Sequence, residues 1–568
     1  MTPATTSAFD LPSHLAHKAA PELVADDETH FAAIAASLER QVRTLEHRLD
    51  EARRARGGGG QQALERDQEI HRLTADLRVL RRFGLDVVLG RVVPEAGDPL
   101  WIGRLGLTDA DGHRLLVDWR APAAEPFFAA THRDPMGLAS RRRYRWDAGR
   151  VADYWDEAFT EEGLGSGAAL DDQSAFIASL GDTRSGRMRD VLSTIQSDQD
   201  AIIRAGSRGA LVVDGGPGTG KTVVALHRAA YLLYSDSRLG DRHGGVLLVG
   251  PHRPYLAYVA DVLPGLGEEG VRTCTVTDLL PEGSSADPEG DAHVAELKSS
   301  ARMIEAIEPA VRLYEEPPSE TVVVETDWAD VAIDTGDWAE AFAAPEPGLP
   351  HNEAREQVHD ALVDESGLPT PDPDQLAGPF AHVIVDEAQE LTDAQWQMLL
   401  ARCPSRSFTV VGDRAQARHG FAESWAERLE RIGLDRHELA TLSINYRTPQ
   451  EVMAEAEPVI RAVLPDANVP TSVRSNGLAV QHGSREDLPS VLTEWLASHE
   501  EGIACVIGDP SVEDGVRVRS LSPEHAKGLE FDLVVLVDPD ELPEGTEAAV
   551  DRYVAMTRAT QQLVVLRH

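Results

Sequence analysis

The sequence predicts an α/β protein with two parallel-sheet lobes, preceded by an antiparallel coiled-coil hairpin and a small β-rich module. The lobes are predicted because short apolar runs, rich in Val, Leu and Ile, alternate with helical segments from about residue 185 onward. Such runs are typical of parallel strands that are covered by helices on both faces. The hairpin is predicted because helix-periodic apolar positions lie on both sides of four consecutive glycines.

The first 83 residues divide into a tail and the hairpin. Residues 1–26 are mostly polar and small, and we expect them to form a mobile tail. Residues 27–83 repeat apolar positions at spacings of three and four, interrupted by Gly57–Gly60, which cannot continue a helix cheaply. A helix pair lying on the body of the protein is the alternative to a coiled coil. The apolar positions are Phe31, Ile34, Leu38, Val42, Leu45, Leu49, Ile70, Leu73, Leu77 and Leu80.

Residues 84–180 form the predicted β-rich module. Its short apolar runs, such as Val87–Leu89 and Leu115–Val117, are broken by Gly, Asp and Pro. Arg141–Trp146 is the densest basic run and contains two aromatic residues. Such a run either contacts nucleic acid or an acidic protein, or pairs with carboxylates of the same acidic chain, and the second interpretation is favoured.

The remaining residues are assigned to two lobes and one insertion. Residues 281–375 are acidic and rich in Pro and Ala, with a helical piece around His351–Glu365, and they interrupt the alternation. We expect them to be an insertion in the first lobe. The predicted segments are lobe 1A at 181–280 and 376–435, the insertion at 281–375, and lobe 2A at 436–568.

Composition excludes several classes of protein. No run of about 18 apolar residues exists, so we expect no membrane-spanning helix. The first residues lack a basic stretch followed by an apolar one, which argues against a secretory signal. Three cysteines lie far apart in sequence, at positions 274, 403 and 505, and fit neither a disulfide framework nor a metal site. We therefore expect a cytoplasmic protein with reduced thiols.

The chain is strongly acidic, with a formal net charge of −41. DNA binding depends on neutralisation of phosphates by Lys and Arg, so a general polyanion binder is excluded. Nucleic-acid binding would need a local basic track, and otherwise the main partner is a protein; solubility alone also explains acidic surfaces. Only four of 54 basic residues are lysines, which indicates that Lys is kept where a compact ammonium is needed. They are Lys18, Lys221, Lys298 and Lys527.

A glycine-rich loop joins the predicted strand Leu211–Val213 to the predicted helix Val223–Tyr234. In this context backbone N–H groups wrap phosphates, and the helix N-terminus adds a positive dipole end. We expect Lys221 to reach the β- and γ-phosphates of ATP and the Thr222 hydroxyl to bind Mg²⁺. The loop consists of Gly215, Gly216, Pro217, Gly218, Thr219, Gly220, Lys221 and Thr222.

Two carboxylates, Asp386 and Glu387, follow the predicted strand Val383–Val385. A lone Asp-Glu pair after a strand is mostly a solvated loop, but here it follows a phosphate-binding loop. We expect Asp386 to hold Mg²⁺ through water and Glu387 to orient or deprotonate the attacking water.

The loop and Asp386–Glu390 resemble helicase superfamily one, the group containing the UvrD and Rep enzymes, and later motifs follow in the expected order. The resemblance covers roughly residues 190–568 and implies two RecA-like lobes. It implies that Gln199 reads adenine, Tyr446 stacks on it and Glu530 binds the ribose. It also implies that Gln416 senses the γ-phosphate and that Arg447 and Arg558 act as arginine fingers. The carrying motifs are Gly412–Gln416, Asn445–Arg447, Lys527–Phe531 and Tyr553–Ala559.

The distribution of these groups predicts an ATP site between the lobes. Lys221 and Mg²⁺ come from the first lobe, and Arg447 and Arg558 come from the second. Phosphoryl transfer depends mainly on positioning and charge stabilisation, so groups of both lobes are expected to contact the γ-phosphate. Loss of the γ-phosphate then removes the interaction that holds the lobes together. Because one chain supplies both fingers, we expect a monomer to complete its own site.

The N-terminal half resembles HelD-type proteins. The carrying residues are Trp101–Leu107, Val117–Pro122 and Pro126–Phe128, together with Gln199–Arg204, Val249–Pro251 and the hairpin. The resemblance implies a motor that binds RNA polymerase core, with DNA or RNA reached through the polymerase complex. In that family the hairpin enters the secondary channel, a first-lobe insertion acts on the primary channel, stalled polymerase is released, and some members protect against rifamycins. No membrane partner is implied.

Several features refine this resemblance. Only 79 residues lie between Arg447 and Lys527, which leaves no room for the extra second-lobe domain of UvrD-like helicases. The insertion is shorter than expected, and the hairpin tip at 53–60 has no carboxylates. In the fifth motif the usual histidine is displaced, because His525 and Ala526 precede Lys527. We therefore do not expect acidic groups to be delivered by the tip.

Three functions are compared. The first is ATP-dependent remodelling or recycling of RNA polymerase. The second is a 3′ to 5′ DNA helicase or translocase of the UvrD/Rep type in DNA repair, against which the missing domain and the hairpin argue. The third is a non-motor protein that uses ATP only as a structural ligand, against which the complete set of predicted catalytic residues argues.

Overall fold

The computed structural model describes most of the 568 residues and divides them into two compact units. One unit contains residues 1–275, 378–390 and 402–568, and the other contains residues 276–377 and 391–401. The described residues are 7–55, 61–160, 192–240, 244–268, 270–280, 289–300, 303, 305–307, 373–418, 421, 423–541 and 545–568.

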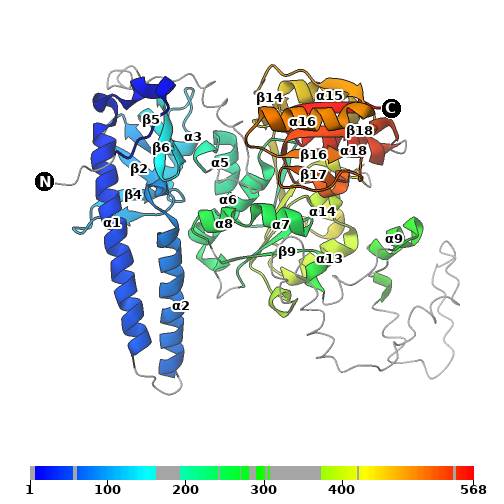
Figure 1. The fold of residues 1–568 in the computed structure, drawn as a ribbon. Helices are drawn as coiled ribbons and strands as arrows, with labels where there is room; N and C mark the ends of the chain where they lie inside the picture. The colour runs from blue at the N-terminus through cyan, green and yellow to red at the C-terminus, as the bar shows by residue number, and fades with distance from the viewer. Residues whose placement is uncertain are drawn as a thin grey trace, which may run out of the picture. The chain divides into compact units, whose positions relative to one another are not determined.

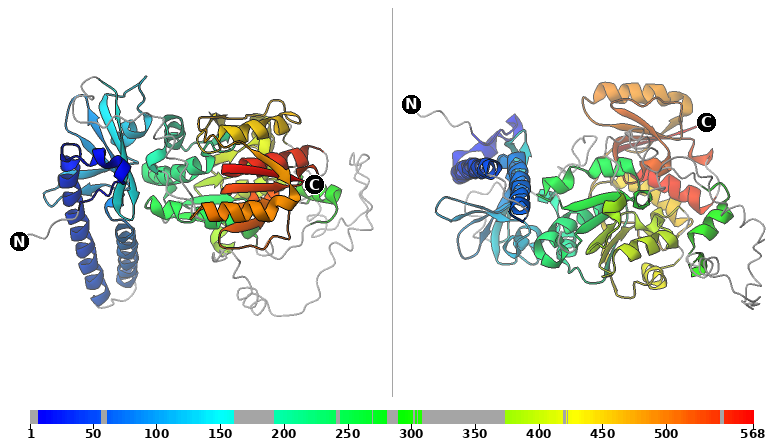
Figure 2. Two further views of the ribbon diagram at one scale, coloured as in Figure 1. Left: turned by 45° about the horizontal axis from the view of Figure 1, so that its top comes forward. Right: turned by 90° about the horizontal axis from the view of Figure 1, so that it is seen from below.

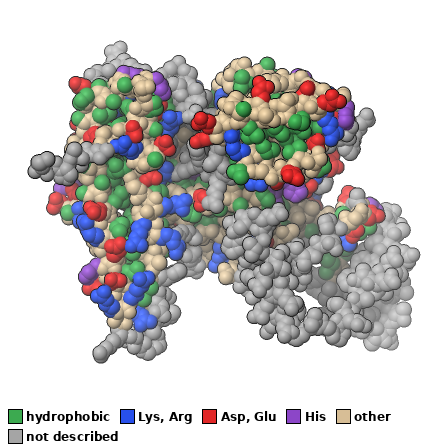
Figure 3. Space-filling view, viewed as in Figure 1, with side chains coloured by type: hydrophobic (Ala, Val, Ile, Leu, Met, Phe, Trp, Pro, Cys, Tyr) green, Lys and Arg blue, Asp and Glu red, His purple; other side chains and the backbone are tan. Residues whose placement is uncertain are grey.

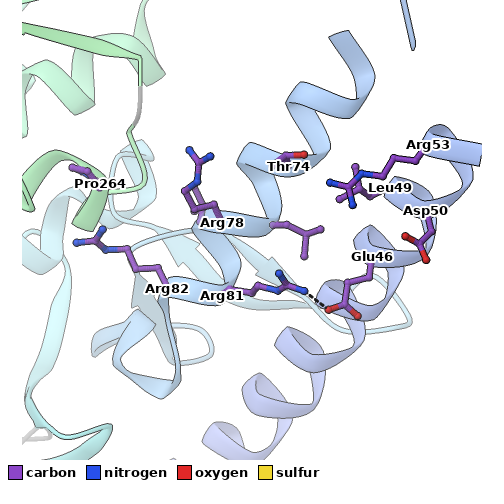
Figure 4. Close-up of a pocket in the computed structure, with 11 residues that line it drawn as sticks. Glu46, Leu49, Asp50, Arg53, Thr74, Arg78, Arg81, Arg82 and Pro264 are labelled. Atoms are coloured by element: carbon purple, nitrogen blue, oxygen red, sulfur yellow. Dashed lines mark hydrogen bonds and ion pairs between the residues drawn. The ribbon is translucent and has the colours of Figure 1, made fainter. Parts of the chain in front are cut away.

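The N-terminal helices α1 (Pro21–Arg54) and α2 (Gln61–Arg82) lie side by side and antiparallel (Figures 1 and 2). Their apolar contact contains Leu49, Leu73 and Leu77, at positions that the periodicity predicted. Charged side chains of both signs cover the visible face of the pair (Figure 3). Arg81 and Glu46 join the two helices by an ion pair of 2.6 Å (Figure 4).

The expectation of a mobile tail over residues 1–26 is wrong for its described part. A 3₁₀ helix, η1, spans Ser13–Ala19, and α1 begins at Pro21. Phe9 is buried and its ring stacks on Phe31 of α1 at 5.9 Å. The ammonium of Lys18 is also buried, 3.1 Å from the Asp153 carboxylate. These partners lie far away along the chain, so local composition does not reveal the packing.

A six-stranded sheet follows the helix pair, in the order β3-β4-β2-β1-β5-β6. Its strands are β1 (Val88–Pro94), β2 (Leu100–Gly103), β3 (Leu107–Thr108), β4 (Arg114–Asp118), β5 (Leu138–Asp147) and β6 (Arg150–Ala158). Two short helical turns, η3 (Pro122–Ala124) and α3 (Glu125–Ala129), connect β4 to β5.

The basic run Arg141–Trp146 lies within β5 and is largely buried. Arg141 pairs with Glu157 at 2.8 Å, and Arg142 pairs with both Asp156 and Asp27 at 2.7 Å. The interpretation that these arginines pair with carboxylates of the chain is therefore confirmed. They stabilise the sheet against α1 and do not form a nucleic-acid surface.

The first lobe is built on a parallel sheet of order β12-β7-β11-β10-β8-β9. Its strands are β7 (Ala210–Gly215), β8 (Val246–Gly250), β9 (Val271–Thr275), β10 (His382–Val385), β11 (Phe408–Gly412) and β12 (His437–Leu442). Its helices are α5 (Ser197–Arg204), α6 (Lys221–Ser235), α7 (Arg253–Val259), α8 (Val262–Gly265) and α14 (Trp425–Ile432).

One domain boundary needs correction. The sequence places the start of lobe 2A at residue 436, but β12 pairs along its whole length with β7 of the first sheet. Most residues of β12 are exposed or half-buried. Because an edge strand of this kind lacks a continuous apolar run, the sequence gives no sign of its sheet. The second lobe therefore begins after Leu442.

The second lobe contains a parallel sheet of order β15-β19-β18-β16-β17. Apolar clusters lie on both faces of the fully buried strand β18. The strands are β15 (Gln481–Ser484), β16 (Ala504–Ile507), β17 (Val518–Leu521), β18 (Phe531–Val537) and β19 (Ala559–Arg567), beside the pair β13 (Ile444–Asn445) and β14 (Thr471–Ser472). The helices are α15 (Gln450–Arg461), α16 (Leu488–Ser498), α17 (Pro523–Ala526) and α18 (Thr546–Thr557).

The second compact unit includes η7 (Thr277–Leu279), α9 (Ala292–Ser299), η9 (Pro373–Leu376) and most of α13 (Asp393–Arg402). The predicted helical piece around His351–Glu365 lies outside the described residues. Together the two parallel sheets, the helix pair and the antiparallel module confirm the predicted fold class. No helix in the described part of the chain is long and apolar enough to cross a membrane.

Candidate nucleotide site

The phosphate-binding loop connects β7 to α6 at the carboxyl edge of the first sheet. Gly218 and Gly220 have φ angles of 71° and 84°, which favour glycine. A Cβ on Gly218 would lie only 2.0 Å from Oδ1 of Asn445, so a side chain would not fit there. The buried Lys221 ammonium donates to the Gly216 carbonyl at 3.0 Å. The two glycine conformations and this hydrogen bond therefore give the loop a compact form.

Thr222 and Asp386 meet beside this loop. The Thr222 hydroxyl donates to Oδ2 of Asp386 at 2.7 Å, and the Tyr255 hydroxyl donates to the same oxygen at 2.5 Å. Burial and the neighbouring Glu387 carboxylate raise the pKa of Asp386. A nearby cation would favour its ionised form, and hydroxyl and carboxylate oxygens are the ligands that Mg²⁺ prefers. Thr222 and Asp386 thus fit the predicted magnesium site.

Glu387 lies next in the chain and has a left-handed backbone, with φ of 55°. This conformation is uncommon for a non-glycine residue and is found often at functional sites. The Gln389 amide donates to Oε2 of Glu387 at 2.6 Å and fixes the carboxylate. Burial opposes ionisation, but Lys527, Lys221 and Arg558 outweigh it and hold the pKa of Glu387 below its usual value. The side chain is therefore an oriented carboxylate suited to act on a water molecule.

Gln416 connects the first lobe to the second. Its amide Nε2 donates to Oδ2 of Asp413 at 2.6 Å, and its Oε1 accepts from Nη2 of Arg558 at 3.2 Å. All three side chains are buried. Burial raises the pKa of Asp413 to about 6. Arg558 therefore reaches the first lobe through a residue that was itself predicted to sense the γ-phosphate.

Arg447 and Glu530 form an ion pair within the second lobe. The family resemblance assigned them to different parts of ATP, with Arg447 at the γ-phosphate and Glu530 at the ribose. The structure instead shows the two side chains bound to each other. For both to hold their assigned roles, nucleotide binding has to separate them.

Gln199 and Tyr446 lie beside the loop and do not line the cavity. The Gln199 amide donates to the Thr219 carbonyl at 2.9 Å, and the Tyr446 N–H donates to the Gly218 carbonyl at 3.1 Å. The Tyr446 hydroxyl lies 3.4 Å from Oδ1 of Asp198. Both residues thus contact the phosphate-binding loop.

Most of the predicted residues line one cavity, even though they come from both lobes. Gly215, Gln199, Asp386 and Tyr446 are the predicted residues outside its lining; Gly215 ends β7 immediately before the loop. The lining also includes Tyr258 and Gly528, which sequence reasoning did not select. The lining residues are Gly216, Pro217, Gly218, Thr219, Gly220, Lys221, Thr222, Tyr258, Glu387, Gln416, Arg447, Gly528, Glu530 and Arg558.

Lys527 is a site residue to which sequence reasoning gave no role. Its buried ammonium forms an ion pair with Glu390, donates to the Gln416 carbonyl at 2.6 Å and lies 3.9 Å from Oε2 of Glu387. It comes from the second lobe, and all three partners come from the first. The sequence signals for this position were the scarcity of lysine and its place at the start of the motif Lys527–Phe531. Gln389 and Asp413 also support the site and lie in motifs that carry the resemblance, although no role was assigned to them; Tyr255 supports it too and lies in no such motif.

Comparisons with known proteins agree with this geometry. Residues 24–173 match the family described as DNA helicase IV HelD, N-terminal domain. Residues 198–422 match the AAA domain family, and residues 373–567 match the viral superfamily 1 RNA helicase core domain. These three families together span the helix pair, the β-rich module and both lobes. No curated protein matches the sequence.

Solved viral helicases resemble the chain weakly. The PRRSV helicase structure is 14% identical with a TM-score of 0.28, and the match covers 76% of this chain and 62% of that one. The complex of Arterivirus nonstructural protein 10 (helicase) with DNA is 16% identical with a TM-score of 0.27, covering 63% and 60%. The chain thus spans about three fifths of the length of these helicases.

Proposed function

We propose that this chain, which is a HelD-like protein of the UvrD/Rep group in helicase superfamily one, is an ATP-hydrolysing motor that binds RNA polymerase and remodels or releases stalled complexes. The helix pair, the β-rich module and the two lobes follow one another along a single chain. The observation that carries the proposal is the match of residues 24–173, which joins a HelD-type N-terminal region to a helicase core.

In the proposed reaction ATP binds between the lobes. Lys221 and the loop N–H groups hold the phosphates, and Thr222 and Asp386 hold Mg²⁺, which neutralises charge on the β- and γ-phosphates when bound. Glu387 orients the attacking water. Gln416, Arg447 and Arg558 contact the γ-phosphate, and the charge that develops on it is stabilised by the two guanidinium groups.

Hydrolysis is coupled to movement through groups that cross between the lobes. Arg558 and Lys527 are bound to first-lobe partners, and both partners, Gln416 and Glu390, belong to segments that follow strands of the first sheet. Loss of the γ-phosphate removes negative charge from the site beside Arg558 and Lys527. The lobes are therefore expected to open and close once per turnover.

Charge supports a protein partner at the helix pair. Residues 39–82 contain eleven arginines and eight carboxylates, whereas the whole chain has a net charge of −41. Several of these arginines lie along a groove between the helices and Pro264 of α8 (Figure 4). Among the residues that the structure describes, no aromatic side chain lines that groove, so they do not offer the stacking surface that single-stranded nucleic acid uses. The basic helix pair therefore suits an acidic protein surface better than a DNA strand.

The second lobe supports a polymerase motor over a DNA helicase. Residues 448–526 are all described, and their helices and strands belong to the second lobe itself. No additional domain interrupts this stretch, although UvrD-like helicases carry one there according to the resemblance. The DNA helicase or translocase function is thus the weaker candidate.

The test compares ATP hydrolysis by the full-length chain in three conditions: alone, with core RNA polymerase, and with single-stranded DNA. We expect polymerase to co-purify with the chain and to stimulate hydrolysis. Stalled transcription complexes should then release RNA or DNA when ATP is added, and a parallel assay with a rifamycin tests protection. Stimulation by DNA alone, with no polymerase bound, would identify a DNA translocase instead.

A further inference from the structure

Arg204 connects the ATP-binding lobe to the N-terminal β-rich module. It lies at the last position of α5, and its side chain is 9% exposed. Its Nη2 donates to the Trp119 carbonyl at 2.8 Å and its Nη1 to the Arg120 carbonyl at 3.4 Å, just after strand β4 of the module. Its Nε donates to the Asp200 carboxylate at 2.9 Å. One guanidinium thus holds two carbonyls of the module and one carboxylate of its own helix.

The other end of α5 contacts the phosphate-binding loop. Gln199 lies in the first turn, where its Oε1 accepts from the Gln196 N–H at 3.1 Å and its Nε2 donates to the Thr219 carbonyl at 2.9 Å. The helix contains only eight residues, so its two ends are separated by roughly 10 Å. A helix this short moves as one body. Any displacement at Arg204 is therefore passed to Gln199.

A second buried arginine fixes α5 against the helix that begins with Lys221. Arg228 of α6 is fully buried and donates to the carbonyls of Ile202, Ala205 and Gly206 at 2.6–2.9 Å. These carbonyls lie at and just beyond the C-terminal end of α5, where cations are favourable. Arg228 therefore holds α5 on its own lobe, whereas Arg204 binds it to the module.

The Trp119 carbonyl is itself held in place by packing. The indole of Trp119 is fully buried and meets the His227 ring of α6 edge to face, with centroids 5.8 Å apart. It also meets the Phe128 ring of α3 at 6.3 Å. The acceptor that Arg204 binds is thus part of a close-packed contact between the module and the helix of the phosphate-binding loop.

We propose that Arg204 is a positioning residue that holds Gln199 against the phosphate-binding loop and so makes adenine recognition depend on the docked N-terminal module. This inference rests on the proposed role of Gln199 in reading adenine. It adds that the module, together with the helix pair it carries, controls the affinity for ATP. A partner that shifts the module changes ATP binding through α5.

Arginine is required at this position for a geometric reason. Its planar fork presents Nε toward Asp200 and both Nη atoms toward separate carbonyls. A lysine ammonium would keep the charge beside Asp200 but could not hold all three acceptors in that plane. Arg204→Lys therefore separates the loss of geometry from the loss of charge.

The test measures KM and kcat of the full-length chain for ATP and GTP, together with the melting temperature. For Arg204→Met we expect the KM for ATP to rise about 5- to 10-fold, which corresponds to the loss of one hydrogen bond between Gln199 and adenine. The kcat should stay within about twofold of the wild type. We expect the preference for ATP over GTP to fall. Arg204→Lys should show a smaller rise of the same kind. Gln199→Ala should lose the preference too, and the double variant should resemble Gln199→Ala alone.

Lys18→Met is the matched control. It removes the buried cation of η1 that pairs with Asp153 of strand β6 at 3.1 Å. We expect a lower melting temperature but an unchanged KM. An equal rise of KM in Lys18→Met would show general loosening of the module and would overturn the inference, as would additive effects in the double variant. If Gln199→Ala keeps the preference for ATP over GTP, the proposed role of Gln199 in reading adenine is refuted. If Gln199→Ala loses that preference but the Arg204 variants keep it, only the positioning role of Arg204 is refuted.

Discussion

Nη2 of Arg558, at the end of α18 in the second lobe, donates to Oε1 of Gln416 in the first lobe at 3.2 Å. Gln416 in turn donates to Asp413, so a buried chain of three side chains joins the lobes next to Glu387. An arginine that already faces the site is positioned before the reaction begins. Pre-positioned donors are effective because they need no reorganisation when charge develops.

Removing Arg558 should stop turnover without preventing ATP binding. Arginine fingers contribute roughly 10³- to 10⁵-fold to the rate, so we expect Arg558→Ala to lose at least about 10³-fold in kcat. Binding of a fluorescent ATP analogue should stay within about threefold, because Lys221 and the loop are untouched. The measurements are steady-state ATP hydrolysis and fluorescence anisotropy. Turnover at the wild-type rate would refute the finger assignment.

Lys527 should control the pH range of activity. Its ammonium is the main cation that lowers the pKa of Glu387 against the opposing effect of burial. In Lys527→Met the pKa of Glu387 should rise, so a larger fraction is protonated at neutral pH and inactive as a base. We expect the acidic limb of the kcat/KM profile to move to higher pH, with partial recovery at alkaline pH.

The matched control for this prediction is Lys298→Met in α9. That lysine has a 61% exposed side chain and forms an ion pair with Glu289 at 2.6 Å. Its profile should coincide with that of the wild type. An unshifted acidic limb in Lys527→Met would show that Glu387 is not the group whose ionisation limits activity.

Much of the site can be predicted because parallel strands bring their carboxyl ends to one edge. The loop after β7, Asp386 and Glu387 after β10, and Gln416 after β11 are far apart in sequence, yet they meet at this edge. Topology alone places them together once the strands are recognised. The alternation of apolar runs with helices was strong enough for that recognition.

What could not be predicted are pairings between side chains from distant segments. The ion pair of Lys527 with Glu390 and the packing of Phe9 on Phe31 depend on three-dimensional contacts, and no local pattern encodes them. The same holds for β12, whose half-exposed residues resemble a loop until β7 is placed beside them. The ion pair between Arg447 and Glu530 was missed because each residue was assigned to ATP separately.

That ion pair permits a charge-swap experiment. Arg447→Glu and Glu530→Arg each place two like charges together, so we expect both single variants to lower the melting temperature. The double variant restores an opposite-charge pair and should recover part of that loss. Neither Arg447→Glu nor the double variant should hydrolyse ATP at more than about 1% of the wild-type rate, because the arginine finger is absent from position 447.

Thermal unfolding and ATP hydrolysis measured on the same three proteins distinguish the two roles. Recovery of stability without recovery of turnover is the expected result. If the double variant regains turnover as well, Arg447 acts only by pairing with Glu530 and does not contact the γ-phosphate.

His382 should make the first lobe sensitive to acid. It begins β10, is fully buried, and its ring nitrogens lie 2.7 Å from the Ser407 hydroxyl and 2.9 Å from the Thr409 hydroxyl. Burial lowers its pKa to about 3, whereas an unfolded histidine titrates near 6.5. Because the unfolded state binds the proton more strongly, this contribution to stability is complete above pH 6.5 and is lost as pH falls toward 3.

Between pH 7.5 and 4.5 the loss amounts to roughly 2 to 3 kcal/mol, because each pH unit between the two pKa values contributes about 1.36 kcal/mol. His382→Gln lacks this titration, so its melting temperature should lie below that of the wild type at pH 7.5 and approach it as the pH falls. Thermal unfolding from pH 7.5 to 4.5 measures the difference between the two proteins, which removes the contribution of other groups. A constant difference across this range would show that the pKa of His382 is the same in the folded and the unfolded protein.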